Sequence, residues 1–248
     1  MFKNLCSILK ISKHCTPKED YLFLIEALAY PDNIFIGYSI TNYLKRVKKY
    51  VFLLASNLSQ SKVYKKFLTH SYISTLIDAV TVYDLGKSRL PSYILEKKKL
   101  SLDDWKIIKE HCFYGAQIIN KALAQNPNSF FLQLCLEVVL YHHEHFDGNG
   151  YPYGLKGEEI PLSARIVALA DVYNALRTNR PYRPAWGHQE TLEYILNQKN
   201  KIFDPLIVDT FLKLHLQFRD ISRELLKDDL LTYEQKYKQQ TNIETEHL

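Results

Sequence analysis

Two adjacent histidines, His142 and His143, come directly before a glycine-rich segment, and they are the strongest sign of chemistry in the chain. They follow an apolar run, so we expect a buried helix over 130–143 that ends at the pair. Neighbouring residues on a helix point about 100° apart. Both imidazoles can therefore face one cavity only if that cavity wraps around the helix end. A lone histidine is more often structural, but a pair beside such a loop favours a site.

Two aspartates stand in apolar surroundings. Asp171 is the only charged residue between Arg165 and Arg177, and Asp84 ends another apolar stretch. A carboxylate inside an apolar helix is costly unless it is paired or binds a metal. Asp171 is therefore either the partner of an arginine or a metal ligand, and Asp84 is either a polar helix end or a ligand.

Histidines and aspartates on separate helices, taken together, indicate a metal site inside a helical bundle. His111, which by itself reads as a surface histidine, becomes a third imidazole of this set. Imidazole and carboxylate ligands suit iron, manganese or zinc. An aspartate can bridge two metals that activate water between them.

The elements that must position these residues are helical. Four of the eight glycines fall within 148–157, so the rest of the chain is poor in the turns that many-stranded folds need. Apolar periodicity predicts an all-α fold with one special loop at 146–159. Caps are expected at Ser101 and Asp204. The predicted helices cover residues 16–30, 39–58, 65–83, 101–123, 130–143, 161–176, 188–198 and 205–226.

Composition excludes several classes of protein. The 248 residues are 46% hydrophobic and 24% charged, which is ordinary for a soluble globular chain. The four cysteines form no CxxC pair and fit a reducing compartment, so we expect a cytoplasmic protein. No apolar run is long enough for a membrane span, and no signal peptide is expected. The net charge of +5 is spread out and does not indicate a nucleic-acid polymer as partner.

Four of the eight arginines lie within 165–183, although lysine is the usual cation of this chain. Clustered guanidinium groups indicate bidentate recognition of phosphate or carboxylate.

These residues resemble the HD-GYP domain family. The segment 142–155, HHEHFDGNGYPYGL, is similar to the family signature HHExxDGxGYPxGL. The likeness extends through 160–183 and back to Asp84-Leu85-Gly86-Lys87 and Glu110-His111, so it covers about 16–226. It implies an HD-domain-like helical bundle over 16–226, an N-terminal extension over 1–15 and a polar tail over 227–248.

The resemblance also implies an activity and roles for single residues. Active members are bacterial signalling enzymes that hydrolyse cyclic di-GMP or a related cyclic dinucleotide at a site of two or three divalent metals, of which iron or manganese is expected here. Asp84 would bridge metals and Lys87 would steady the scissile phosphate. The implied metal ligands are Asp84, His111, His142, His143 and Asp171, and the implied ligand-binding residues are Tyr151, Pro152, Arg180 and Arg183.

The chain departs from the family pattern where the name-giving His-Asp pair is expected. Tyr83 precedes Asp84, and an earlier family histidine falls on Tyr43 or, in another register, on Tyr38. One metal position has therefore lost two imidazoles, and one or two ions are expected. Tyrosine is a poor ligand for divalent ions at neutral pH. We expect the Tyr83 hydroxyl to donate a hydrogen bond to a neighbouring carboxylate, for which Asp171 is the candidate.

Two functions remain open from the sequence. The first is a metal-dependent cyclic di-GMP phosphodiesterase with a partly degenerate metal site. The second is an inactive domain that senses a cyclic dinucleotide or binds a protein partner.

Overall fold

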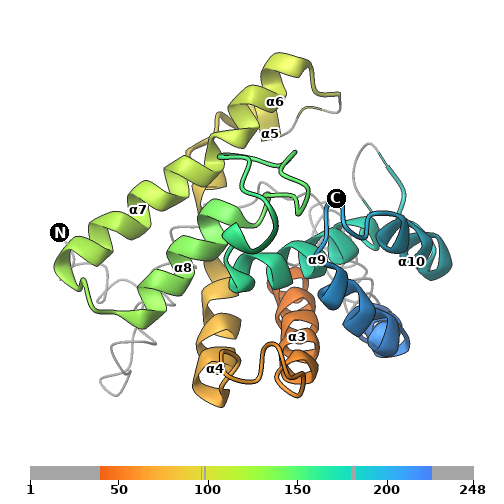
Figure 1. Cartoon of the computed structure of the whole chain (residues 1–248). Coiled ribbons are helices and arrows are strands. Elements are labelled where there is room, and N and C mark those ends of the chain that lie inside the picture. The colour runs from red at the N-terminus through yellow and green to blue at the C-terminus, as the bar shows by residue number, and fades with distance from the viewer. Residues whose placement is uncertain (1–39, 96, 98, 180–182, 225–248) are drawn as a thin grey trace, which may run out of the picture.

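The computed structural model describes residues 40–95, 97, 99–179 and 183–224, and these form helices joined by short loops (Figure 1). The described residues contain no strand, and Lys199 and Phe203 form an isolated β-bridge. The all-α prediction is confirmed for this part of the chain. The helix expected over 16–30, the extension over 1–15 and the tail over 227–248 lie outside the described residues.

The elements follow the predicted order, and their bounds differ in detail. After α10, residues 205–224 form a last helix. The elements with defined bounds are α3 (Ile40–Leu58), α4 (His70–Ala79), the 3-10 turns η1 (Val80–Val82) and η2 (Leu85–Arg89), α5 (Ser92–Leu95), α6 (Leu102–Lys109), α7 (His111–Gln125), α8 (Phe130–Tyr141), the 3-10 turn η3 (Gly157–Glu159), α9 (Leu162–Leu176) and α10 (His188–Asn197).

The helix predicted over 65–83 is shorter than expected. It begins at His70, because the Thr69 side chain caps it by accepting a hydrogen bond from the amide of Tyr72. At Ala79 it tightens into η1, and Asp84 then stands between the two 3-10 turns. Asp84 is thus presented by a turn between two 3-10 segments and not by a regular helix.

The helix predicted over 101–123 is divided at Glu110 into α6 and α7. Its predicted cap is confirmed, since Ser101 accepts from the Asp104 amide and the Asp104 carboxylate accepts from the Ser101 amide. The division has a local cause. The His111 imidazole donates to the backbone oxygen of Ile108, and a side chain that enters the helical hydrogen-bond ladder bends the helix there.

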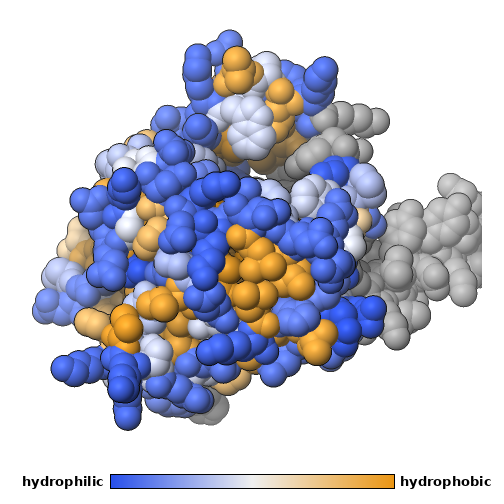
Figure 2. Space-filling model, turned by 45° about the vertical axis from the view of Figure 1, so that its right-hand side comes forward, coloured by the Kyte–Doolittle hydropathy of each residue, from blue (hydrophilic) through white to orange (hydrophobic). Residues whose placement is uncertain are grey.

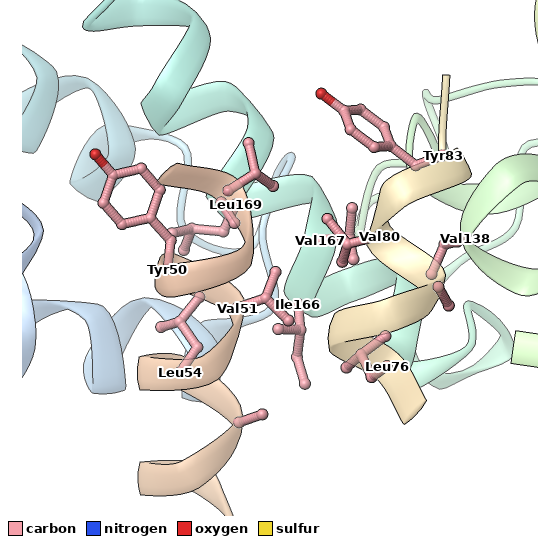
Figure 3. Packing of buried hydrophobic residues seen from close by; sticks show 14 of the residues in the cluster. Tyr50, Val51, Leu54, Leu76, Val80, Tyr83, Val138, Ile166, Val167 and Leu169 are labelled. Carbon is pink, nitrogen blue, oxygen red and sulfur yellow. The ribbon is translucent and has the colours of Figure 1, made fainter. Parts of the chain in front are cut away.

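The hydrophobic core lies between α3, α4, α8 and α9. Figure 3 shows side chains of α3 facing those of α9, with α4, η1 and α8 closing the other side. Each such side chain that is fully buried contributes roughly 1.5–3 kcal/mol. The labelled residues of this packing are Tyr50, Val51, Leu54, Leu76, Val80, Tyr83, Val138, Ile166, Val167 and Leu169.

Helix α9 also carries polar contacts that fasten it to both ends of the described chain. The fully buried Arg46 donates from Nε to Asn174 Oδ1 at 2.8 Å. Arg165 lies 2.6 Å from a carboxylate oxygen of Asp204, so the first of the four clustered arginines grips a carboxylate of its own chain. Asp204 also accepts from the amide of Leu206, which confirms its predicted role as a cap.

The face of the molecule drawn in Figure 2 is mostly hydrophilic, with apolar side chains gathered near its middle. Within the described ranges, every helix is too short or too polar to cross a membrane.

Candidate metal centre

Four of the five predicted metal ligands converge. Asp84, His111, His142 and His143 each offer a ligand atom, and these atoms all lie within 4.8 Å of one another. They come from three places: the bend between η1 and η2, the first residue of α7, and the end of α8. His111 is fully buried, so its interpretation as a surface histidine is wrong.

The end of α8 explains how two adjacent histidines reach one site. The helix stops at Tyr141 and His142 is its C-cap, so His143 no longer follows the helical rotation. The two imidazole centroids lie 4.0 Å apart, and each is within 5.6 Å of the His111 centroid. Both imidazoles thus face one site at the end of α8, as the sequence predicted.

Gly86 brings Asp84 close to His111, and the sequence interpretation gave it no role. A Cβ at this position would lie 1.8 Å from the backbone oxygen of His111 and 2.6 Å from the amide nitrogen of Gly115. Real Cβ atoms do not approach so closely, so η2 can pack against α7 only with glycine here. Its place two residues after a metal-site aspartate is the signal that could have revealed it.

Two backbone carbonyls fix the orientation of the buried imidazoles. His111 donates from Nδ1 to the oxygen of Ile108, and His142 donates from Nδ1 to the oxygen of Val138, both at 2.6 Å. A neutral imidazole has one donor nitrogen and one acceptor nitrogen. The Nε2 atoms therefore carry the lone pairs, and they face Asp84 Oδ1 at 3.4 Å from His111 and 3.7 Å from His142. His111 Nε2 also lies 3.6 Å from Cys112 Sγ. This is the tautomer that a metal ligand requires.

The charges of the site also suit a cation. Burial lowers the pKa of His111 to about 4, although Asp84 acts in the opposite direction. Loss of hydration, together with the neighbouring imidazoles, lowers the pKa of His143 as well. Burial alone would raise the pKa of Asp84, but Lys87 and the two histidines hold it well below its usual range. At neutral pH, the neutral imidazoles of His111 and His143 therefore lie beside an ionised Asp84 carboxylate.

Two atoms at the centre of the cluster lack protein partners. Asp84 Oδ1 and His142 Nε2 are both buried, and no hydrogen bond reaches either of them from the described residues. A buried acceptor without a partner costs about 1–3 kcal/mol, so the arrangement needs a ligand to be satisfied. One divalent ion with bonds near 2.0–2.2 Å would fit this donor set after a small closure of the side chains.

Asp171, the fifth predicted ligand, is engaged by two tyrosines. Its Oδ1 accepts a hydrogen bond from the Tyr83 hydroxyl at 2.7 Å and another from the Tyr43 hydroxyl at 3.1 Å. The predicted bond between Tyr83 and Asp171 is therefore confirmed. The Tyr83 ring packs edge-on against His142, with 5.1 Å between the centroids. Asp171 is not part of the four-residue group. Tyr38, the alternative to Tyr43 as the position of the earlier family histidine, lies outside the described residues.

The glycine-rich loop is held by Glu144, which belongs to the signature but had no assigned role. Glu144 is 2% exposed, and its carboxylate accepts from the amides of Tyr153 at 2.7 Å and Leu155 at 3.0 Å. At Gly150 a Cβ would lie 2.2 Å from the amide nitrogen of His145, so the loop folds directly onto the backbone that follows the metal ligands.

Tyr151 and Pro152 are placed at the edge of the centre. The Tyr151 ring stacks on His143, with 4.7 Å between centroids and 24° between planes. The Lys109 ammonium lies 4.9 Å from the centroid of the same ring. Pro152 follows through a cis peptide bond. Lys87, the predicted phosphate contact, donates to Asp84 Oδ2 at 2.6 Å and is partly exposed.

The arginines predicted to hold phosphate are less fully placed. Arg183 donates to the backbone oxygen of Ala175 at 2.9 Å and lies 5.3 Å from the Trp186 ring centroid. A second nitrogen of its guanidinium is buried without a hydrogen-bond partner in the described structure. Arg180 lies outside the described residues.

Comparison with known proteins identifies the family. The model of the HD domain family matches residues 42–207. The chain belongs to the HD domain family. The matched segment contains the four clustered residues, both tyrosines and the glycine-rich loop, so the site described above lies entirely within the HD domain.

Curated relatives of this HD domain chain carry phosphodiesterase names. A probable cyclic di-GMP phosphodiesterase of Vibrio cholerae is 36% identical over 76% of this chain and 43% of its own length. A cyclic di-GMP phosphodiesterase response regulator of Xanthomonas campestris is 41% identical over 58% of this chain and 37% of its own. The chain thus spans less than half the length of these relatives.

A solved structure supports the fold. The crystal structure of a cyclic GMP-AMP-specific phosphodiesterase of Vibrio cholerae superimposes with a TM-score of 0.51 and 19% identity. The superposition covers 84% of this chain and 53% of the other. This likeness extends the agreement in fold beyond the segment that the family model matches.

Proposed function

We propose that this HD domain hydrolyses a cyclic dinucleotide, with cyclic di-GMP as the first candidate, at a centre that holds one divalent metal, iron or manganese. The observation that carries the proposal is the set of Nε2 atoms of His111 and His142 facing Asp84 Oδ1, with both Nδ1 atoms bound to backbone carbonyls. Such a set is preorganised for a metal that polarises a phosphoryl oxygen and lowers the pKa of water.

Residues around the centre supply the other parts of such a site. Lys87 is the cation next to Asp84 and would contact a phosphate oxygen. The Tyr151 ring and Pro152 would support a base, and this requires Lys109 to leave the ring or to pair with a phosphate instead. Arg183 has an unsatisfied buried nitrogen, and Arg180 precedes it by three residues, so both stay proposed phosphate contacts.

Turnover tests the proposal. The full chain, loaded with manganese or ferrous iron, is incubated with cyclic di-GMP, and the linear product is followed by chromatography. Asp84→Asn serves as the inactive variant, and His145→Gln, a loop histidine outside the cluster, serves as the control. We expect product with the unmodified chain and with His145→Gln only. Binding of cyclic di-GMP without any product would instead favour the sensor function.

The restriction to one metal rests on Tyr83 and Tyr43. Their hydroxyls occupy the Asp171 oxygen that would otherwise face a second ion. An unperturbed phenol titrates near pH 10, so neither tyrosine offers an anionic ligand at neutral pH. We therefore infer that the chain keeps one metal position with imidazole ligands and lacks a complete second metal position.

Replacing Tyr83 with histidine tests this restriction directly. We predict that Tyr83→His raises the metal content above the one ion per chain expected for the unmodified protein. The reason is that the substitution adds an imidazole beside Asp84 and removes one of the two tyrosine hydrogen bonds to Asp171, while the bond from Tyr43 stays. Metal per chain is measured by mass spectrometry after dialysis, with Tyr93→Phe on exposed α5 as the control. Two tightly bound ions in the unmodified chain would contradict the one-metal proposal without affecting the hydrolase proposal.

A further inference from the structure

A second cluster of titratable side chains lies where α9, α10 and the helix over 205–224 meet (Figure 1). His188 Nε2 is 3.1 Å from His215 Nδ1, and the two rings are parallel within 4°. On its other side, His188 Nδ1 is 3.0 Å from the hydroxyl of Tyr173, which is fully buried. None of these residues belongs to the metal centre.

Three arginines surround this histidine pair. Arg219 and Arg223 follow His215 by four and eight residues, so they share its face of the helix. Arg177 comes from the end of α9. Burial first, and then the electrostatic influence of the neighbouring His215 and of the three arginines, lower the pKa of His188 to about 4. His188 is thus neutral at pH 7 beside three permanent cations.

The neighbouring acids balance this positive charge only in part, since one of the three arginines has a carboxylate partner. Asp220 pairs with Arg219 at 2.9 Å, and Glu224 pairs with Lys49 at 3.4 Å. Two imidazole nitrogens 3.1 Å apart could in principle share a metal ion, but three guanidinium groups repel a cation. The sign of the charge therefore selects an anion.

One nitrogen of Arg177 has no hydrogen-bond partner among the described residues. Arg177 donates from Nη1 to the backbone oxygen of Trp186, and the nitrogen without a partner is its buried Nε. An unsatisfied buried donor on a charged group is costly, and an oxyanion would satisfy it.

We propose that Arg177, His188, His215, Arg219 and Arg223, here called the basic cluster, form a binding site for a phosphate group, either inorganic phosphate or a phosphomonoester. Guanidinium groups bind phosphate oxygens in a bidentate manner, and a dianion matches the excess positive charge better than a single carboxylate does. Both nitrogens of His188 are engaged within the cluster, so the imidazole donor for the phosphate is His215 Nε2. The site is separate from the proposed hydrolase centre and does not depend on it.

The test uses the full chain and inorganic phosphate as the probe. Imidazole signals of His188 and His215 are followed by NMR during a phosphate titration, with potassium chloride at equal ionic strength as reference and AMP as a phosphomonoester. His188→Gln and His215→Gln assign the signals. We expect saturable shifts with phosphate, and a rise in the pKa of His188, because a nearby dianion favours imidazolium. A stronger response to AMP would identify the ester as the ligand.

Charge-matched variants decide whether the site is specific. Arg219→Gln and Arg223→Gln remove partly or fully exposed guanidinium groups, and each should weaken phosphate binding about tenfold or more. Lys213→Gln, on an exposed position of the same helix, removes the same charge and should leave the affinity unchanged. The proposal is overturned if chloride produces the same shifts, if acetate binds as tightly as phosphate, or if Lys213→Gln weakens binding as much as the arginine variants.

Discussion

Single hydrogen bonds set the properties of the metal centre. The Ile108 and Val138 carbonyls hold the imidazoles of His111 and His142 in the tautomer that exposes Nε2. Both acceptors are backbone oxygens of helices, so their positions do not depend on the conformation of a side chain. The two ligands are therefore oriented before any ion binds.

The first prediction concerns His142 itself. His142→Gln should reduce metal affinity at least tenfold, because it removes one of three imidazole ligands and its carbonyl anchor. Equilibrium dialysis with manganese, followed by metal analysis, measures the effect. His145→Gln changes the same residue type three positions later, outside the cluster, and should bind metal like the unmodified chain. Equal metal content in both variants would count against the site.

Residue types predicted part of this centre well. Asp84, His111, His142 and His143 converge as expected, and the bond from Tyr83 to Asp171 is present. The second bond, from Tyr43, was not predicted, since it depends on how α3 packs against α9 over 128 residues of separation. A pattern of residues gives candidates for contact, but packing decides which atoms meet.

Close packing of elements is the second determinant of the site. Gly86 lets η2 touch the start of α7, where a Cβ would overlap the His111 carbonyl. The distance between Asp84 and His111 is therefore controlled by a residue that binds nothing itself.

We predict that Gly86→Ala destabilises the protein by about 2–4 kcal/mol and weakens metal binding, because η2 must move away from α7. Urea unfolding and equilibrium dialysis measure the two effects. Gly187→Ala is the matched control, since a Cβ there meets nothing within 4 Å, and it should cost less than about 1 kcal/mol. Similar losses for both variants would show that the close approach is not the cause.

The glycine-rich loop is held by contacts of its own, which the Glu144 carboxylate supplies. Glu144→Gln should loosen it, because one amide oxygen replaces two carboxylate oxygens that accept from Tyr153 and Leu155. We expect faster hydrogen exchange at these two amides, while metal content stays unchanged. Exposed Glu158, changed to Gln, is the control. Unchanged exchange in Glu144→Gln would mean that the loop is ordered by other contacts.

Element boundaries were harder to predict than element identity. Helical periodicity continues through Glu110 and through 65–69, yet α6 ends before Glu110 and α4 begins only after Thr69. In the first case the His111 side chain competes for a helix carbonyl, and in the second Thr69 caps a later start. Both causes are side-chain hydrogen bonds, which the spacing of apolar residues does not reveal.

At the scale of the whole molecule, neutral buried histidines make stability depend on pH. Burial lowers the folded-state pKa of His111 to about 4 and that of His188 to about 4, while an unfolded histidine titrates near 6.5. Below pH 6.5 the unfolded chain therefore binds more protons than the folded one, and stability falls as pH falls.

We predict that the metal-free protein loses about 2 kcal/mol between pH 7.5 and pH 5 from His111 alone, with a smaller loss from the more exposed His188. Urea midpoints at the two pH values measure this. The variant His188→Gln should lower the pH dependence slightly. A stability that stays constant over this range would show that the two histidines titrate normally in the folded state.

Three consecutive residues, His142, His143 and Glu144, serve two ligand positions and one loop anchor, and they do so without a spacer. The length of this segment is therefore fixed, because each of its three residues has a role that depends on its position. A single-residue insertion after Tyr141 would move His142 to the second ligand position and His143 to the place of Glu144, so the first ligand and the loop carboxylate would both be lost. An insertion elsewhere, for example in the exposed turn at 126–128 between α7 and α8, does not change the position of these three residues relative to the end of α8. Tolerance of this chain to changes in length should thus fall to its minimum at 142–144, which an insertion scan would locate independently of any assay for a ligand.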